Sequence, residues 1–196
     1  TPSNSSAASD VYKRQQEEVV AVITKPSRPA GRGRKILPPP IKIIAENYRL
    51  SVIQPENIKD KAFVNWVSKK NPDLIVVCAY GKILPEEILN IPPLGCINIH
   101  PSLLPRYRGP APINWAILNG DKVTGVTIIK MDSGVDTGDI IVQKKIYIDE
   151  DKETLKSSYE KLHRELQNLF KENWEELNKS FLRKFNAFLK GALHFW

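Results

Sequence analysis

The chain has 196 residues, 41% of them hydrophobic and 26% charged, and its formal net charge is +7. This balance is typical of a folded domain, and two cysteines, Cys78 and Cys96, are too few for a disulfide-stabilised secreted scaffold. The longest apolar run, residues 74–80, is too short to span a bilayer, and the N-terminus lacks the basic and apolar regions of a signal peptide. We therefore expect one domain in a reducing compartment, either the cytoplasm or an organelle.

The predicted elements alternate between strands and helices. Residues 1–18 open with a Ser/Ala/Asn-rich stretch without apolar periodicity and are expected to be a foreign or disordered leader. β-Branched runs then predict strands, and apolar residues at helical spacing predict helices. In chain order these are a strand at 19–24, a helix at 41–48, a strand at 51–53, a helix at 60–70, a strand at 74–80, a helix at 84–89, a strand at 95–100, a helix at 111–118, and strands at 124–131 and 140–148. This alternation predicts an α/β fold with an open, mostly parallel sheet.

The last part of the chain has a different pattern. Apolar side chains recur at spacings of three and four from Leu155 to Leu177, which predicts one long amphipathic helix. Residues 179–196 are aromatic and basic and are expected to form an atypical helical tail, either the end of a packed helix or a helix on a membrane surface.

Most of the positive charge lies in one basic block. Between Lys25 and Lys35 the chain carries five cations and no anion. Such a block neutralises phosphates where it lies near a binding surface, and otherwise it is a solvated loop. Charge alone favours the solvated loop.

The stretch that follows residue 97 carries the strongest chemical signal. Asn98 and His100 are two apart in a predicted strand, so both side chains point to the same face. Pro101 ends the strand and leaves them at its carboxyl edge, where open α/β sheets bind ligands. An amide donor beside an imidazole can stabilise an oxyanion and transfer a proton. The alternative, at even weight, is that Asn98 caps a turn and His100 is a hydrogen-bonded core histidine.

An acidic turn follows further along the chain. Its carboxylates and glycines are Asp132, Gly134, Asp136, Gly138 and Asp139. The spacing does not match a calcium loop, and the two cysteines lie in apolar strands without metal-ligand spacing, so we predict no metal site. A carboxylate from this turn beside His100 would orient the imidazole ring. Spacing does not say which of the three it is, although Asp132 and Asp139 are more typical of an exposed turn.

Taken together, these motifs resemble the folate-dependent formyltransferases. The resemblance rests on Asn-x-His-Pro-Ser-Leu-Leu-Pro at 98–105 and Met-Asp-x-Gly-x-Asp-Thr-Gly-Asp at 131–139. Further matches lie at 25–35, 38–42, 54–56, 79–81 and 83–85. The similarity extends from about Val19 to about Asn178, and the basic block resembles the branch of the family that acts on methionyl-tRNA.

The resemblance implies a Rossmann-like formyltransferase domain over residues 19–178 with specific site residues. The catalytic residues would be Asn98 and His100, which hold the oxyanion, and Asp136, which orients His100 and assists proton transfer. The loop that lines the 10-formyltetrahydrofolate site would be Ser102, Leu103, Leu104 and Pro105. The cations that engage the initiator tRNA would be Arg28, Arg32, Arg34 and Lys35, with Arg32 the main contact. No metal is implied, and we expect a monomer.

The resemblance also implies that the chain is incomplete. The family begins with a strand and a Gly-Thr-Pro-x-Phe loop that residues 1–18 do not contain, and full-length members carry a C-terminal β-barrel domain that is absent after residue 178. Three functions stay open: formylation of methionyl-tRNA for translation initiation, formylation of a sugar nucleotide or glycinamide ribonucleotide by a sister enzyme, and binding of folate or tRNA by an inactive fragment.

Overall fold

The structure is a computed structural model that describes residues 19–30 and 35–148, together with helical residues 157, 160–162, 164, 165 and 168. Its strands are β1 (Val22–Ile23), β2 (Arg28–Ala30), β3 (Lys35–Leu37), β4 (Val52–Ile53), β5 (Ile75–Cys78), β6 (Cys96–His100), β7 (Val123–Lys130) and β8 (Ile140–Tyr147). Its helices are α2 (Pro40–Asn47), α3 (Lys61–Lys70), α4 (Glu86–Leu89) and α5 (Pro112–Leu118). Every strand and helix predicted between residues 19 and 148 is present, and the α/β class is confirmed. The expectations for residues 1–18 and 179–196 lie outside the described residues.

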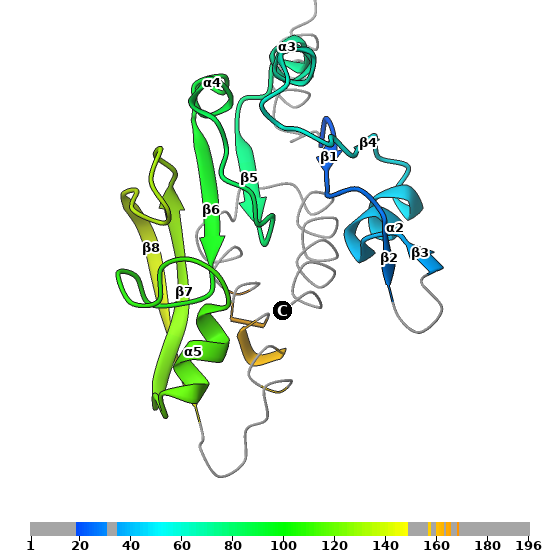
Figure 1. Cartoon of the computed structure of the whole chain (residues 1–196). Coiled ribbons are helices and arrows are strands. Elements are labelled where there is room, and N and C mark those ends of the chain that lie inside the picture. Colours follow the sequence, from blue (N-terminus) through cyan, green and yellow to red (C-terminus); the bar gives the residue numbers. More distant parts are fainter. Residues whose placement is uncertain are drawn as a thin grey trace, which may run out of the picture.

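The strands form three sheets in the described residues. β1 pairs with β4, β2 pairs with β3, and the largest sheet has the order β5-β6-β7-β8 (Figure 1). The pairs β1–β4 and β5–β6 are parallel, and each is joined through a helix, α2 or α4. This follows from geometry, because a parallel pair needs a crossover connection. In the ranges that the structure describes, no helix has the length and apolar character to cross a membrane.

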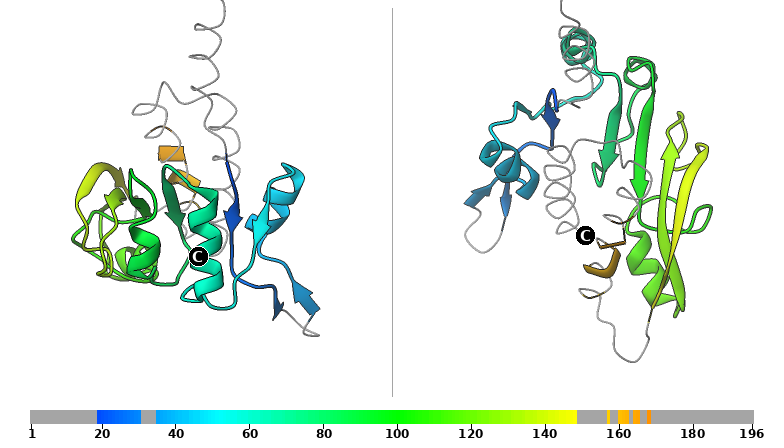
Figure 2. Two further views of the ribbon diagram at one scale, coloured as in Figure 1. Left: turned by 90° about the horizontal axis from the view of Figure 1, so that it is seen from above. Right: turned by 180° about the vertical axis from the view of Figure 1, so that it is seen from behind.

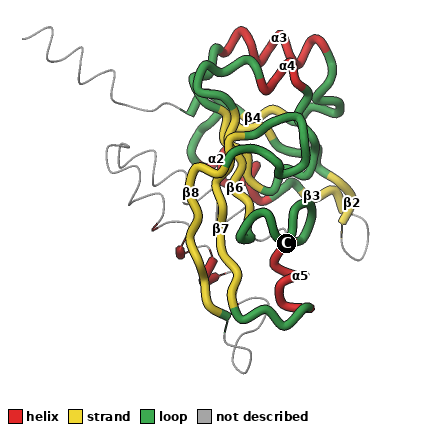
Figure 3. Tube along the Cα trace, turned by 90° about the vertical axis from the view of Figure 1, so that its left-hand side faces the viewer, coloured by secondary structure: helices red, strands yellow, loops and turns green. Residues whose placement is uncertain are grey.

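The β8 side of the large sheet is antiparallel. β6 pairs with β7 and β7 with β8 in opposite directions, and β7 and β8 run side by side as long strands (Figure 3). Only a turn, residues 131–139, joins β7 to β8, so these two strands must run in opposite directions. The sheet, predicted to be mostly parallel, is mixed: it is parallel where α4 joins β5 to β6 and antiparallel from β6 to β8.

The basic block contains an antiparallel hairpin that the sequence did not predict. Arg28 lies opposite Leu37 and Ala30 opposite Lys35, so the chain reverses direction between residues 30 and 35. The hairpin lies on the opposite side of the molecule from β8 (Figure 2). Pro29 lacks an N–H group, and a proline argues against a strand. The apolar side chains of β3 are exposed, so β3 does not show the alternation of buried and exposed residues that predicts a strand.

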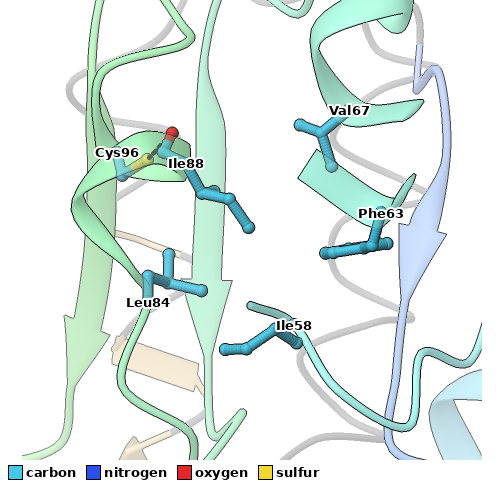
Figure 4. Packing of buried hydrophobic residues seen from close by; sticks show 6 residues of the cluster. All are labelled: Ile58, Phe63, Val67, Leu84, Ile88 and Cys96. Carbon is cyan, nitrogen blue, oxygen red and sulfur yellow. Dashed lines mark hydrogen bonds between the residues drawn. The ribbon is translucent and has the colours of Figure 1, made fainter. Parts of the chain in front are cut away.

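Helices α3 and α4 pack on one face of β6. Their buried side chains Phe63, Val67 and Ile88 meet Ile58, Leu84 and Cys96 in one cluster, shown in Figure 4. α3 begins where the Asp60 carboxylate accepts a hydrogen bond from the Ala62 N–H at 2.9 Å, and it ends at Asn71, which is left-handed. The helix therefore begins and ends where capping residues predict.

The opposite face of β6 is buried as well. Ile97 and Ile99 pack with Val126 and Ile128 of β7 in a second cluster. Because side chains alternate along a strand, Asn98 and His100 share the face of Cys96. β6 is therefore a central strand whose position is fixed by apolar packing on both sides.

The predicted long helix is described only in part. Leu162 belongs to its helical residues and is buried against Ile113 of α5 and Ile146 of β8. This contact matches the predicted apolar face. Residues 169–177 of the predicted helix lie outside the described residues.

Both cysteines are free thiols, and burial raises their pKa, to about 12 for Cys78 and about 11 for Cys96. We expect both to resist a disulfide exchange reagent in the native protein at about pH 8, because only the thiolate reacts and the fraction of Cys96 in that form is about one in a thousand. Both should react at once in concentrated guanidinium chloride. Rapid labelling of the native protein would show that β5 or β6 opens readily.

Candidate active site

β6 places Asn98 and His100 near the carboxyl end of an inner strand of the large sheet. Asn98 lies between Val77 of β5 and Ile129 of β7 in register, and His100 is the last residue of the strand. His100 is only 4% exposed. Figure 1 shows that the loop joining β6 to α5 begins at this end of the strand. The predicted pair therefore lies at the carboxyl end of a central strand.

Asp136 is the carboxylate that reaches this pair. Its Oδ1 accepts a hydrogen bond from Asn98 Nδ2 at 2.9 Å, and its Oδ2 lies 3.4 Å from His100 Nδ1. The side chains of His100 and Asp136 are 5% and 12% exposed, so water screens their interaction little. The structure thus brings together the three side chains that the resemblance selected, which lie up to 38 residues apart in the sequence.

The other two carboxylates of the turn do not enter the site. Asp132 and Asp139 are exposed, as their turn context predicts. Asp132 Oδ1 accepts hydrogen bonds from the Thr137 hydroxyl at 2.7 Å and from the Gly134 N–H at 3.0 Å. The Thr137 hydrogen bond is the main cause that lowers the pKa of Asp132. Asp132 therefore shapes the turn that presents Asp136.

A second loop supplies main-chain groups that sequence reasoning missed. The Tyr107 carbonyl oxygen lies 2.8 Å from His100 Nε2, and the Gly109 N–H donates to Asp136 Oδ2 at 2.9 Å. Arg108 Nε donates to the Asp136 carbonyl oxygen at 3.0 Å. No side-chain pattern signals a main-chain donor or acceptor, and the only cue in the sequence is the glycine at 109.

These contacts favour particular hydrogen positions on the imidazole ring. A carbonyl oxygen only accepts, so His100 Nε2 carries a hydrogen in this arrangement. A bare lone pair on Nδ1 would face the Asp136 carboxylate unfavourably, so a proton between Nδ1 and Oδ2 favours the contact. His100 and Asp136 can therefore hold a proton together and transfer it.

The loop predicted to line the folate site is tied to β7 and β8. Ser102 is fully buried, with its hydroxyl donating to the Arg106 carbonyl oxygen at 2.7 Å. Leu104 is 6% exposed, whereas Leu103 is half-buried and Pro105 is exposed. Ser102 and Leu104 therefore set the shape of the loop, and Leu103 and Pro105 form the part of its surface that a ligand can reach.

Two further residues that the sequence did not single out hold this loop. Thr127 Oγ1 donates to the Ser102 carbonyl oxygen at 2.6 Å and accepts from the Leu104 N–H at 3.2 Å. Gln143 Nε2 donates to the Leu104 carbonyl oxygen at 2.8 Å and to Thr127 Oγ1 at 2.9 Å. A polar residue at a buried β7 position, such as Thr127, is the signal that could have pointed to this contact.

Two of the predicted tRNA-binding cations, Arg28 and Lys35, lie on the hairpin. Arg28 begins β2 and is exposed, and Lys35 begins β3. Arg32 and Arg34 lie outside the described residues. Over the described ranges, no group of three His, Cys, Asp or Glu side chains is arranged to hold a metal ion.

Most of the chain is similar in sequence to known proteins. The family model described as "Formyl transferase" matches residues 1–173. The chain is 52% identical over 145 residues to the methionyl-tRNA formyltransferase of Syntrophus aciditrophicus, covering 74% of this chain and 46% of the relative. It is 48% identical over 167 residues to that of Desulfotalea psychrophila, covering 85% of this chain and 51% of the relative. The chain therefore spans about half the length of the curated relatives it matches.

Solved structures share the fold. Phosphoribosylglycinamide formyltransferase from Bacillus halodurans aligns with a TM-score of 0.62 at 25% identity, covering 93% of this chain and 85% of that one. The formyltransferase PseJ from Anoxybacillus kamchatkensis, solved with a formamido sugar nucleotide and tetrahydrofolate, aligns with a TM-score of 0.52 at 32% identity, covering 75% and 72%. The arrangement of strands and helices described above is thus similar to those of formyltransferases with different acceptors.

Proposed function

This chain belongs to the formyl transferase family, and we propose that it transfers a formyl group from 10-formyltetrahydrofolate to the amine of initiator methionyl-tRNA in the cytoplasm. The observation that carries the proposal is the contact of Asp136 with both Asn98 and His100 at the end of β6. The acceptor is inferred from the curated relatives, which are named methionyl-tRNA formyltransferases. The folate donor is supported by the tetrahydrofolate in the PseJ structure.

The reaction needs an oxyanion to be stabilised and a proton to be moved. The methionyl amine attacks the formyl carbon, and the formyl oxygen becomes an oxyanion. One Nδ2 hydrogen of Asn98 donates to Asp136, which leaves the second for the oxyanion. The Nε2 hydrogen of His100 stays on the side of the Tyr107 carbonyl and can be shared with the same oxygen as a two-acceptor hydrogen bond.

The tetrahedral intermediate then collapses. The bond between the formyl carbon and N10 of the folate breaks, N10 gains a proton, and the amine loses one. The proton that lies between Asp136 Oδ2 and His100 Nδ1 is released to N10 as that bond breaks, and the pair then takes up the proton that the amine loses. The net products are formylmethionyl-tRNA and tetrahydrofolate.

The folate is proposed to bind along the loop at residues 102–105. Leu103 and Pro105 offer apolar surface there, and the buried hydrogen bonds of Ser102 and Leu104 hold the loop rigid. A rigid loop lowers the entropy that binding costs.

The experiment that tests the acceptor compares three substrates in one assay. The chain is given 10-formyltetrahydrofolate with methionyl-tRNA, with glycinamide ribonucleotide, or with an amino sugar nucleotide, and formylated product is measured. We expect product from methionyl-tRNA alone. Product from a small acceptor instead would support a sister enzyme, which the solved structures make the second candidate. Folate binding without any product would support a binding fragment.

The hairpin is proposed to engage the tRNA. Its strands hold Arg28 and Lys35 at either side of the reversal that contains Arg32 and Arg34. We expect Arg32→Ala to weaken the use of methionyl-tRNA while the affinity for folate stays unchanged, because the guanidinium acts locally on phosphates. The defect should shrink at high salt, where the unmodified chain also weakens. An equal loss of folate affinity would mean that the block is structural.

A further inference from the structure

A tight turn at residues 106–109 supplies the site with two main-chain groups. The Tyr107 carbonyl contacts His100, and the Gly109 N–H contacts Asp136. Tyr107 and Gly109 both have positive φ, 56° and 86°. A left-handed conformation is unfavourable for tyrosine, so contacts elsewhere must hold this turn in shape.

Those contacts come from Asp121, just before β7. Asp121 Oδ2 accepts a hydrogen bond from the Tyr107 hydroxyl at 2.7 Å, and Asp121 Oδ1 accepts one from Arg106 Nη2 at 2.9 Å. Asn119 Nδ2 donates to the same hydroxyl at 3.1 Å. The Asp121 side chain is 13% exposed, and its main-chain N–H bonds to the Ala116 carbonyl oxygen at 2.9 Å. The carboxylate is thus fixed to the end of α5.

We propose that Asp121 is a positioning residue for His100 and acts through Tyr107. The tyrosine is held at two points, with its hydroxyl on Asp121 and its carbonyl oxygen facing the imidazole. Loss of the hydroxyl anchor lets the strained backbone of Tyr107 relax, which withdraws the carbonyl oxygen from Nε2. His100 then loses the contact that fixes its ring and its proton.

The Arg106 side chain has a lesser part in this arrangement. The Arg106 side chain is 59% exposed, and exposed ion pairs contribute little to stability. It bonds to Asp121 and to the Tyr107 hydroxyl, but its own main chain faces Ser102 rather than His100. Arg106→Gln therefore serves as a control that keeps the Tyr107–Asp121 hydrogen bond.

The first readout does not depend on enzymatic activity. The chain is labelled with ¹⁵N-histidine, and the imidazole signals of His100 are identified by their loss in His100→Gln. In the unmodified chain we expect the ¹⁵N shifts of a ring with Nε2 protonated and hydrogen-bonded. Tyr107→Phe and Asp121→Ala should both move these shifts toward those of a freely exchanging imidazole, whereas Arg106→Gln and the distant Asp60→Ala should leave them in place. Unchanged His100 signals in Tyr107→Phe would overturn the proposal.

The second readout rests on the proposed function. Tyr107→Phe and Asp121→Ala should each lower kcat for formyl transfer about 10-fold to 100-fold with little change in KM for the folate, because a small misplacement of a catalytic group has effects of this size. The double variant should be no slower than the slower single variant, since both break the same link. Additive losses would show that Asp121 does not act through Tyr107.

The ¹⁵N shifts of His100 test the positioning role of Asp121, and the formylation rate also tests the proposed function. A chain that formylates no acceptor but shows the His100 shifts would contradict the proposed function and keep the positioning role. Asp121→Asn retains an acceptor for the tyrosine hydroxyl and should recover part of both the signal and the rate. Tyr107→Phe removes a single hydroxyl group, so it still tests the link if Asp121→Ala does not fold, which a thermal melt of each variant will establish.

Discussion

His100→Ala is expected to lower the rate of formyl transfer about 10²-fold to 10³-fold, the usual effect of removing one oxyanion donor. In the proposed mechanism His100 both donates to the oxyanion and passes a proton with Asp136, and it is almost fully buried, so solvent cannot replace it. Binding of 10-formyltetrahydrofolate should change little, because the loop at residues 102–105 is held by Thr127 and Gln143. The rate is measured by single-turnover formylation and the affinity by titration of the folate.

The matched control lies in the same turn as Asp136. Asp139 is an exposed carboxylate three residues further along, and only its main-chain oxygen bonds to the sheet, at 2.9 Å from the Lys130 nitrogen. Asp139→Asn removes one charge, as Asp136→Asn does, but should keep the rate of the unmodified chain. Asp136→Asn should lose about as much as His100→Ala, since the two groups act as a pair. Unimpaired turnover in His100→Ala would remove the catalytic assignment.

The elements that the sequence predicted best are those with continuous apolar packing. β6 is buried on both faces, by Ile97 and Ile99 on one side and Cys96 on the other, and its apolar run was visible without any structure. The same periodicity fixed which face carries Asn98 and His100. A strand that is buried on both faces needs apolar side chains along its whole length, so its sequence shows a continuous apolar run.

The parts that could not be predicted depend on contacts without a side-chain pattern. Spacing alone left three carboxylates as candidates, and Asp136 was selected by the resemblance; in the structure, the turn in which Asp136 has a positive φ of 52° brings it to His100. The Tyr107 carbonyl and the Gly109 N–H belong to the main chain, which every residue has. The hairpin at β2 and β3 has exposed apolar residues, so burial gave no signal there.

The turn that presents Asp136 is closely packed against β7, so Gly138→Ala should destabilise the chain more than the other substitutions proposed above. A β-carbon at residue 138 would overlap the Lys130 carbonyl oxygen and approach the Lys130 carbonyl carbon at 2.9 Å and the Asp132 nitrogen at 3.3 Å. These are backbone atoms of β7 and the turn, so neither can move aside as a flexible side chain would. We expect the free energy of unfolding to fall by about 3 kcal/mol, at the upper end of overpacking effects, as measured by urea denaturation.

Gly120→Ala is the control that separates this overlap from backbone strain. Gly120 has φ +65°, but a β-carbon there meets no atom within 4 Å, so the variant should lose only about 1 kcal/mol. Gly138→Ala should also slow formylation well below its melting temperature, because the turn must shift two residues from Asp136. If the free energy of unfolding fell equally in both variants and both kept the formylation rate of the unmodified chain, the turn would be able to move away from Lys130 without cost. The placement of Asp136 would then not depend on this close approach.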